Sequence, residues 1–220
     1  MIVLALLFAS ISVKGQDILS VEAYVGPTIP HGALGQIEEM GTIVGIGATL
    51  YPSSSFGIRG DFSVERFDDG HGFSDNGLTA PGADVYRLRG MAVLPLALGT
   101  FLVDTRPGDS HGSRFQSSFA VGVGMTKLNI GVAVPIESLP DSLQPFGNTF
   151  KLQNSYLSLH AVQEAGYRFR ESFEGFVRVG LDWGFSKSRD YRILELLSSD
   201  VEPMSNVISV PFIVGGRFRF

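Results

Sequence analysis

The sequence contains no cysteine, so no disulfide framework can stabilise it. Charged residues make up only 18% of the chain, below the roughly 25% that is typical of soluble domains. The 17 lysines and arginines are outnumbered by 22 aspartates and glutamates, which argues against a nucleic-acid partner. Stability must therefore come from the backbone and its packing, and the surface has few charges with which to face water.

Long apolar runs are also missing, apart from one at the start of the chain. Residues 2–11 are apolar except for one serine, but the run is too short for the roughly 20 residues of a membrane helix. It predicts the core of a signal peptide over residues 1–15, although no basic residue precedes Lys14. Cleavage would leave a single domain over residues 16–220 with a formal charge of −6, because Lys14 is lost from a chain of net charge −5. Its apolar runs are all too short for a membrane helix, so it could cross a membrane only with strands.

The rest of the chain shows a period of two, in segments of about ten residues separated by glycine, proline, serine and aspartate. In the clearest segment Ile58 and Phe62 alternate with Arg59 and Asp61, so that one face is apolar and the other carries both signs of charge. The same pattern predicts eight strands, over residues 18–27, 42–51, 56–65, 84–96 (with a possible extension to 103), 113–128, 155–169, 176–185 and 208–220.

The charged faces of these strands predict a network of side chains inside a barrel. Its expected members are Arg59, Asp61, Glu65, Arg87, Arg89, His160, Glu164, Arg168, Arg178 and Asp182. We expect Arg59 to pair with Asp61 or Glu65, and Arg178 to pair with Asp182 or Glu164. At eight strands such a lumen is just filled by side chains, which favours a salt-bridged plug over an ion path.

The predicted connections alternate between long and short. Those over 28–41, 67–83, 129–154 and 186–206 are long, whereas those over 52–55 and 171–175 are tight. The link over 104–112 is the exception. Membrane barrels show this asymmetry, because their turns on one side are short and their external loops are long.

These patterns predict an all-β fold, a closed antiparallel up-and-down transmembrane β-barrel of eight strands. In hydrocarbon every backbone N–H and C=O must be paired within the protein, so a sheet can span a membrane only when it closes. Alternation alone does not tell which face is inside, and a secreted, lipocalin-like ligand-binding barrel would have the opposite polarity. Aromatic residues near the strand ends favour the membrane version: Tyr51, Phe56, Tyr86, Tyr167, Phe169, Trp183, Phe185 and Phe218.

The last strand, with Phe218 and Phe220 alternating with arginines, resembles the C-terminal assembly signal of bacterial outer-membrane barrels. The glycine alternation over 120–124 and the loop asymmetry extend this resemblance to the small OmpA/OmpX-type and opacity-type barrels, here without a periplasmic domain. The resemblance implies location in the cell outer membrane, contact with its lipid, and recognition of Phe218 and Phe220 by the barrel assembly machinery. It also implies a structural, adhesive or porin-like role, with loops that could meet an extracellular partner.

Catalytic and metal-binding patterns are weak. Ser158, His160 and Glu164 share one face of a strand, but positions 160 and 164 lie roughly 13 Å apart along it, too far for a hydrogen bond. The acidic cluster over 68–76 is typical of a solvated turn. We therefore expect no catalytic residue, no metal and no cofactor. A lipid-modifying barrel enzyme of the lipid A deacylase type, built around His160, is the alternative.

Overall fold

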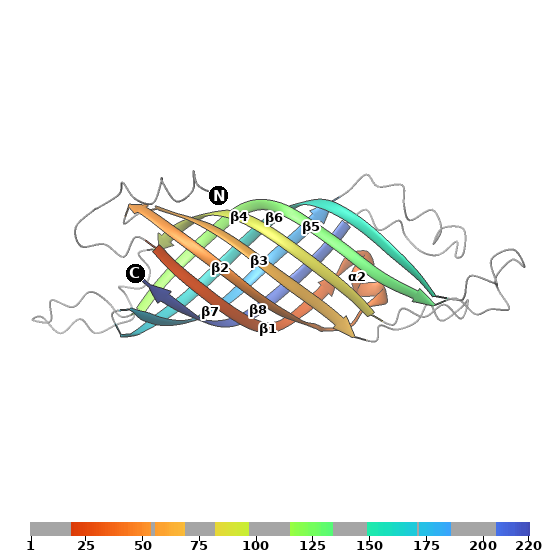
Figure 1. Ribbon diagram of the computed structural model, residues 1–220, viewed down its shortest axis with the longest axis horizontal. Helices are drawn as coiled ribbons and strands as arrows, with labels where there is room; N and C mark the ends of the chain where they lie inside the picture. Colours follow the sequence, from red (N-terminus) through yellow and green to blue (C-terminus); the bar gives the residue numbers. More distant parts are fainter. Residues whose placement is uncertain are drawn as a thin grey trace, which may run out of the picture.

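The computed structural model describes residues 19–53, 56–68, 82–96, 115–133, 149–170, 172–185 and 206–220. They form eight antiparallel strands and one short helix (Figure 1). The strands are β1 (Leu19–His31), β2 (Gly41–Ser53), β3 (Phe56–Asp68), β4 (Gly82–Leu96), β5 (Phe115–Ala133), β6 (Thr149–Arg170), β7 (Phe173–Phe185) and β8 (Asn206–Arg219), and the helix is α2 (Gly32–Ile37). None of the described residues forms a helix long and apolar enough to cross a membrane.

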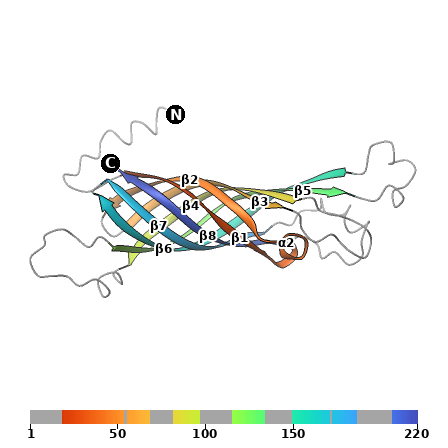
Figure 2. The ribbon, with the colours of Figure 1, turned by 90° about the horizontal axis from the view of Figure 1, so that it is seen from below.

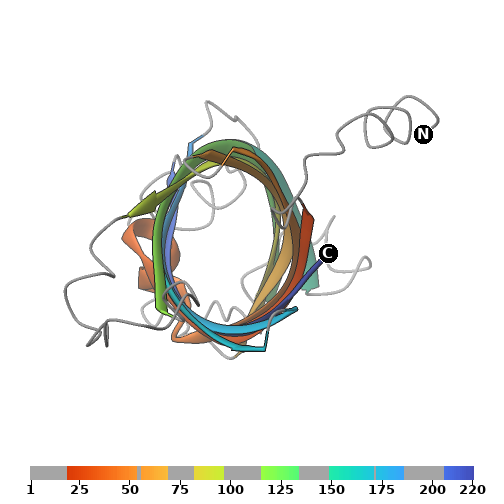
Figure 3. The ribbon, with the colours of Figure 1, turned by 90° about the vertical axis from the view of Figure 1, so that its left-hand side faces the viewer.

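Each strand pairs with its neighbours in chain order, and β8 pairs with β1 to close the sheet. Figure 3 shows the closed ring end-on. The prediction of an eight-stranded, closed, up-and-down barrel is therefore confirmed. At the end of the barrel that carries the short turns, the Phe220 N–H donates to the Leu19 carbonyl at 2.9 Å, which extends the closing ladder.

The register sets the tilt of the strands. A path across the paired positions leaves β1 at Ser20 and returns to β1 at Pro30, ten residues farther along the same strand. It passes through Thr49, Arg59, Met91, Gly122, His160, Asp182 and Ser209. For eight strands this stagger implies a tilt of about 40°. Ten residues then rise by roughly 25 Å along the barrel axis, the height of the apolar band of an outer-membrane barrel.

The outer face of the barrel is apolar and the inner face is polar. Exposed outward side chains include Val44, Ile46, Ile58, Phe62, Leu88, Val123, Met125, Leu157, Leu159, Val177, Leu181 and Val214. Charged side chains of the same strands, such as Arg59, Arg87 and Asp182, are fully buried inside. This polarity is opposite to that of a lipocalin-type barrel, whose interior is apolar.

Glycines on the inner face make room for large side chains. A Cβ at Gly45 would lie 2.3 Å from the Tyr24 ring, and one at Gly215 would lie 2.3 Å from the Phe176 ring. At Gly124 it would lie 2.8 Å from His160 Nε2. The alternating glycines in the sequence are therefore a packing requirement, since a narrow barrel cannot hold arginines and aromatic rings on every strand.

The predicted connection over 28–41 is wrong in its extent. β1 continues to His31, and α2 occupies most of the remaining segment. Pro27 and Pro30 indicate a loop in the sequence, but proline is tolerated where a ladder hydrogen bond is absent. Gly32, at φ 62°, supplies the left-handed turn from β1 into α2. Leu34 is completely buried, so the helix is anchored to the barrel.

The predicted connection over 129–154 is also too long, because β5 and β6 extend into it to Ala133 and from Thr149. This hairpin projects beyond the rest of the barrel in Figure 2. At the other end, β7 begins at Phe173, inside the predicted turn 171–175. The predicted signal peptide, the link over 104–112 and most of the connections over 67–83 and 186–206 lie outside the described residues.

The packing of inward glycines can be tested with two glycines of neighbouring strands, the inward Gly122 of β5 and the outward Gly90 of β4. A Cβ at Gly122 would lie 2.1 Å from the Gly90 carbonyl oxygen, whereas a Cβ at Gly90 has nothing nearer than 4.0 Å. Gly122→Ala should destabilise the barrel by about 1–3 kcal/mol. Gly90→Ala should change the free energy of unfolding by less than about 0.5 kcal/mol. Urea unfolding of the two variants in lipid vesicles measures both, and equal stabilities would contradict this account of the glycines.

Candidate functional site

The lumen holds a network of ion pairs, and it is the candidate functional site. Salt bridges among the described residues of the lumen join six arginines to six carboxylates, so the network has no net charge. Its members are Arg59, Arg87, Arg89, Arg178, Arg217 and Arg219 with Glu22, Asp61, Glu65, Glu164, Glu174 and Asp182. The pairs form two groups along the barrel axis, named here after their central carboxylates.

The Glu164 cluster consists of Glu22, Arg59, Glu164, Arg178 and Arg217. Arg178 Nη2 lies 2.7 Å from Glu22 and 2.6 Å from Glu164. Arg217 Nη2 lies 2.7 Å from each of the same two carboxylates. Arg59 Nη2 lies 3.0 Å from Glu164. Three cations thus bridge two anions contributed by opposite parts of the wall, and the cluster crosses the lumen.

Aromatic rings and a further carboxylate extend this cluster. The Arg178 guanidinium lies 4.6 Å from the centre of the Phe176 ring and 5.2 Å from that of the Tyr24 ring. Arg217 also lies over Phe176, at 5.0 Å, and pairs with Glu174 at 3.1 Å. Cation–π contacts of this kind stabilise charges that have lost their water. The arginines are therefore fixed by rings as well as by carboxylates.

The Asp182 cluster consists of Asp61, Glu65, Arg87, Arg89, His160 and Asp182, and it lies toward the end of the barrel that carries α2. Asp182 lies 3.6 Å from Arg87 and 3.4 Å from Arg89. Arg87 Nε is 2.5 Å from Glu65, and Arg89 Nε is 3.1 Å from Asp61. Two hydroxyl groups complete the contacts of Arg87, which donates to Thr126 at 3.0 Å and to Ser209 at 2.9 Å.

A chain of hydrogen bonds within this region joins Ser158, His160 and Asp182. Ser158 Oγ lies 2.9 Å from His160 Nε2, and His160 Nδ1 lies 2.5 Å from Asp182 Oδ1. The expected separation of His160 and Glu164 holds, since Glu164 belongs to the other cluster. The carboxylate comes instead from β7, where Asp182 is the register partner of His160. Strand register cannot be derived from the sequence alone, so this arrangement was missed.

Nine of the ten predicted network residues are buried inside the barrel. The tenth, Arg168, is only half-buried and lies outside both clusters. The predicted pair of Arg178 with Glu164 is present, at 2.6 Å. The pairing predicted for Arg59 differs, because Arg59 meets Glu164 and Glu22 rather than Asp61 or Glu65. A long arginine side chain reaches across the narrow lumen more readily than along its own strand.

The sequence analysis missed four members of the network: Glu22, Glu174, Arg217 and Arg219. Glu22 lies between the apolar Val21 and Ala23, so the same alternation of apolar and polar residues could have identified it. Glu174 fell within a predicted turn, and the two arginines were considered only as part of the assembly signal. Whether Phe218 and Phe220 act as that signal stays a prediction; both rings are exposed on the outside of the barrel.

Aromatic side chains gather near both ends of the barrel wall. At the end with the short turns, the Phe169 ring lies 5.2 Å from Tyr167 and 6.1 Å from Phe173. At the other end, the rings of Trp183 and Phe185 are 6.0 Å apart. Aromatic rings at two levels with aliphatic side chains between them are typical of a barrel that spans a bilayer.

The ion pairs of the lumen limit which ions this site can bind or conduct. The two central carboxylates, Glu22 and Glu164, have side chains only 1% and 5% exposed, so water barely reaches them. Each is bound to more than one arginine, and each of the three arginines is bound to at least one of them, so every charged side chain at this level has a partner. Within the described part of the chain, no three histidine or carboxylate side chains are arranged to hold a metal ion. The site is therefore a closed ionic layer across the lumen.

No family model matches the sequence, and no curated protein matches it. Solved structures do match. Neisserial surface protein A (NspA) is 11% identical with a TM-score of 0.58, over 92% of this chain and 97% of its own. A major outer membrane protein from Thermus thermophilus is 14% identical with a TM-score of 0.57, over 92% and 99%. The outer membrane protein OprG from Pseudomonas aeruginosa is 13% identical with a TM-score of 0.50, over 92% and 96%.

The fold and its polarity define the class. The chain has the fold of the small eight-stranded barrels of bacterial outer membranes, as the resemblance of its sequence implies. At these identities the likeness establishes the fold alone, and the role of the protein must be argued from its own residues.

The Glu164 cluster can be tested by removing its central charge. Glu164→Gln leaves Arg59, Arg178 and Arg217 with Glu22 as their main counter-ion and should destabilise the barrel by about 3–5 kcal/mol. Lys127→Gln, which removes an exposed charge from the outer face of β5, should change stability by less than about 0.5 kcal/mol. Denaturant unfolding in lipid measures both variants. Unchanged stability of Glu164→Gln would show that the ion pairs are not structurally important.

Proposed function

We propose that the protein is an integral outer-membrane protein whose sealed barrel anchors its external loops, in a structural or adhesive role rather than as a porin. The observation that carries this proposal is the Glu164 cluster, in which three arginines and two glutamates close the lumen. The membrane location is supported by the apolar outer face and by the aromatic rings near both ends of the wall.

The connections between strands are consistent with an anchor. Segments of 13, 15 and 20 residues, over 69–81, 134–148 and 186–205, join strands at the end that carries α2. Two of the three connections at the opposite end are only two residues long, between β2 and β3 and between β6 and β7, whereas the third, over 97–114, has 18 residues. We propose that the long segments face the outside of the cell, where a partner could bind, and that the assembly machinery recognises Phe218 and Phe220.

Cell fractionation tests the membrane location, and conductance measurements then test whether the lumen is closed. The protein should be recovered with the outer membrane and should need detergent for extraction; recovery in a soluble fraction would contradict the membrane location. Purified protein in planar bilayers should give no stable channel steps. The triple variant Arg59→Ala, Arg178→Ala, Arg217→Ala removes the cations of the Glu164 cluster and should conduct. Stable steps from the unmodified protein would contradict the anchor and favour a porin.

The second candidate is a lipid-modifying barrel enzyme, and the hydrogen-bonded chain Ser158–His160–Asp182 is the observation that favours it. Two observations count against it. Ser158 is completely buried in the lumen, away from any lipid ester. Asp182 also faces Arg87 and Arg89, which compete for the negative charge that would stabilise an imidazolium on His160.

The two candidates differ in what Ser158→Ala and His160→Ala should do. If the barrel is an anchor, neither variant changes the lipid A composition of cells that express the protein, compared with cells that express the unmodified chain. Mass spectrometry of extracted lipid A provides the measurement. A change in acylation that depends on both side chains would establish the enzyme instead.

A further inference from the structure

One amide interrupts the apolar outer wall. On β6 the side chains of Ala161, Gln163 and Ala165 point outward in a row, and Gln163 is exposed. Tyr167 lies four residues from Gln163 toward one end, and Leu159, opposite Trp183, lies four residues toward the other. Each step of four residues is roughly 10 Å along the axis of a barrel with this tilt. Gln163 therefore lies midway between the two levels of aromatic rings, at the centre of the proposed membrane span.

The hydrogen bonds of this amide are incomplete. Within the described residues, the side chain of Gln163 makes one hydrogen bond, in which Nε2 donates to Ser117 Oγ at 3.0 Å. Its carbonyl oxygen and its second N–H still need partners. Lipid tails offer neither a donor nor an acceptor, so an amide left this way in hydrocarbon is unfavourable. A partner that meets Gln163 at this depth must bring a polar group with it.

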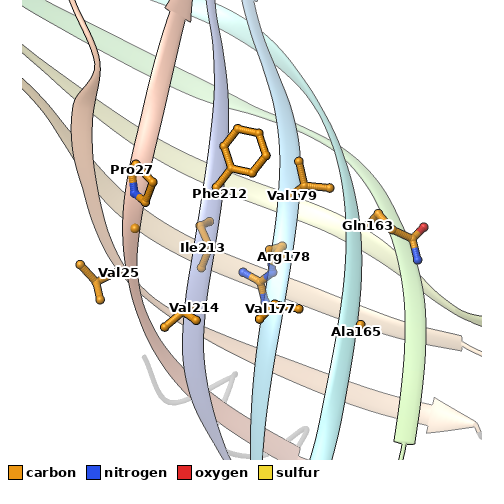
Figure 4. A pocket seen from close by; sticks show the side chains of 11 residues that line it. Val25, Pro27, Gln163, Ala165, Val177, Arg178, Val179, Phe212, Ile213 and Val214 are labelled. Carbon is orange, nitrogen blue, oxygen red and sulfur yellow. The ribbon is translucent and has the colours of Figure 1, made fainter.

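A hollow of about 620 Å³ opens beside Gln163 and runs across the outer wall toward β1 (Figure 4). Its outer edge is formed by Val25, Pro27, Ala165, Val179 and Phe212. The hollow lies where two ladders are interrupted: β1 and β8 leave two positions unpaired after Val25, and β7 and β8 leave two unpaired after Val179. Pro27 and Pro211 lie at these gaps. Neither has a backbone N–H to donate, which accounts for the missing hydrogen bonds between the strands.

We propose that two copies of the chain associate through this wall, about a two-fold axis that runs beside Gln163 along the membrane normal. This inference rests on the proposed membrane location. Two copies inserted in the same direction can be related only by an axis along the normal, so a residue on the contact line meets its own copy at equal depth. The Gln163 carbonyl of each copy then accepts from the free N–H of the other. The small side chains of Ala161 and Ala165 allow the two strands to approach closely.

The two flanks of Gln163 differ, and this symmetry places one against the other. On one side lies the hollow over β7, β8 and β1, and on the other lie Phe119 of β5 and Leu94 of β4. A two-fold axis at Gln163 turns the Phe119 side of one copy toward the hollow of the other. A lipid acyl chain could fill the hollow, but it would leave the amide without a partner. A second copy places its Phe119 side over the hollow and also offers the amide a hydrogen-bond partner.

The absence of native cysteine makes single-cysteine cross-linking a direct test. Ala165→Cys places a thiol next to the axis and leaves Gln163 intact. Oxidation of intact membranes that contain this variant should give a disulfide-linked dimer. Ile46→Cys is the matched control, because Ile46 points outward from β2, four strands around the ring and at a similar depth. It should remain monomeric.

Adding Gln163→Leu to the Ala165→Cys variant should lower the dimer association constant by roughly tenfold, because two hydrogen bonds in hydrocarbon are lost. Protease resistance of each variant confirms that it is folded. Equal cross-linking of Ala165→Cys and Ile46→Cys, or none from either, would overturn the dimer. Cross-linking that does not respond to Gln163→Leu would overturn the amide pair. Because only the membrane pellet is oxidised, absence of the protein from that pellet would instead overturn the membrane location.

Discussion

The constraint on which the structure depends is closure of an eight-stranded sheet with a stagger of ten residues. Closure pairs β1 with β8 and leaves no open edge, as hydrocarbon requires. It also fixes a narrow interior that can hold side chains but little else. Glycines such as Gly45 and Gly124 on the inner face follow from that narrowness, since they clear space for Tyr24 and His160. The size of the barrel thus determines what its lumen can contain.

A narrow lumen that is lined with charge is stable only if every charge is paired. Buried ion pairs do not in general contribute more than well-packed apolar side chains, because desolvation offsets their attraction. Here they also specify register. A slip of one residue in any strand would turn its charged face toward lipid and its apolar face inward, leaving partners such as Glu22 and Arg217 unpaired. The same network that selects one register also closes the lumen, which is why we favour an anchor over a pore.

The sequence predicts the architecture better than it predicts the contacts. Alternation along 56–65 and seven similar segments was enough to find all eight strands, eight of the twelve members of the network and the buried His160. It failed at Pro30 in β1, where local composition contradicts the tertiary structure, and in the outer hairpin of β5 and β6, where the segment with the alternating Ile130 and Val132 of β5 was predicted as a loop. Pairings such as Arg59 with Glu164 join strands 105 residues apart in the chain and depend on a register that one sequence does not encode locally.

The central claim is that the apolar face of this barrel lies against lipid while its charged face lies inside. Trp183 tests it most directly, because it is the only tryptophan in the chain and points outward near one end of the wall. In vesicles of brominated lipid its fluorescence should be strongly quenched, most by bromine placed close to the headgroups, and aqueous acrylamide should have little effect. Full quenching by acrylamide with none from brominated lipid would contradict this orientation of the barrel wall.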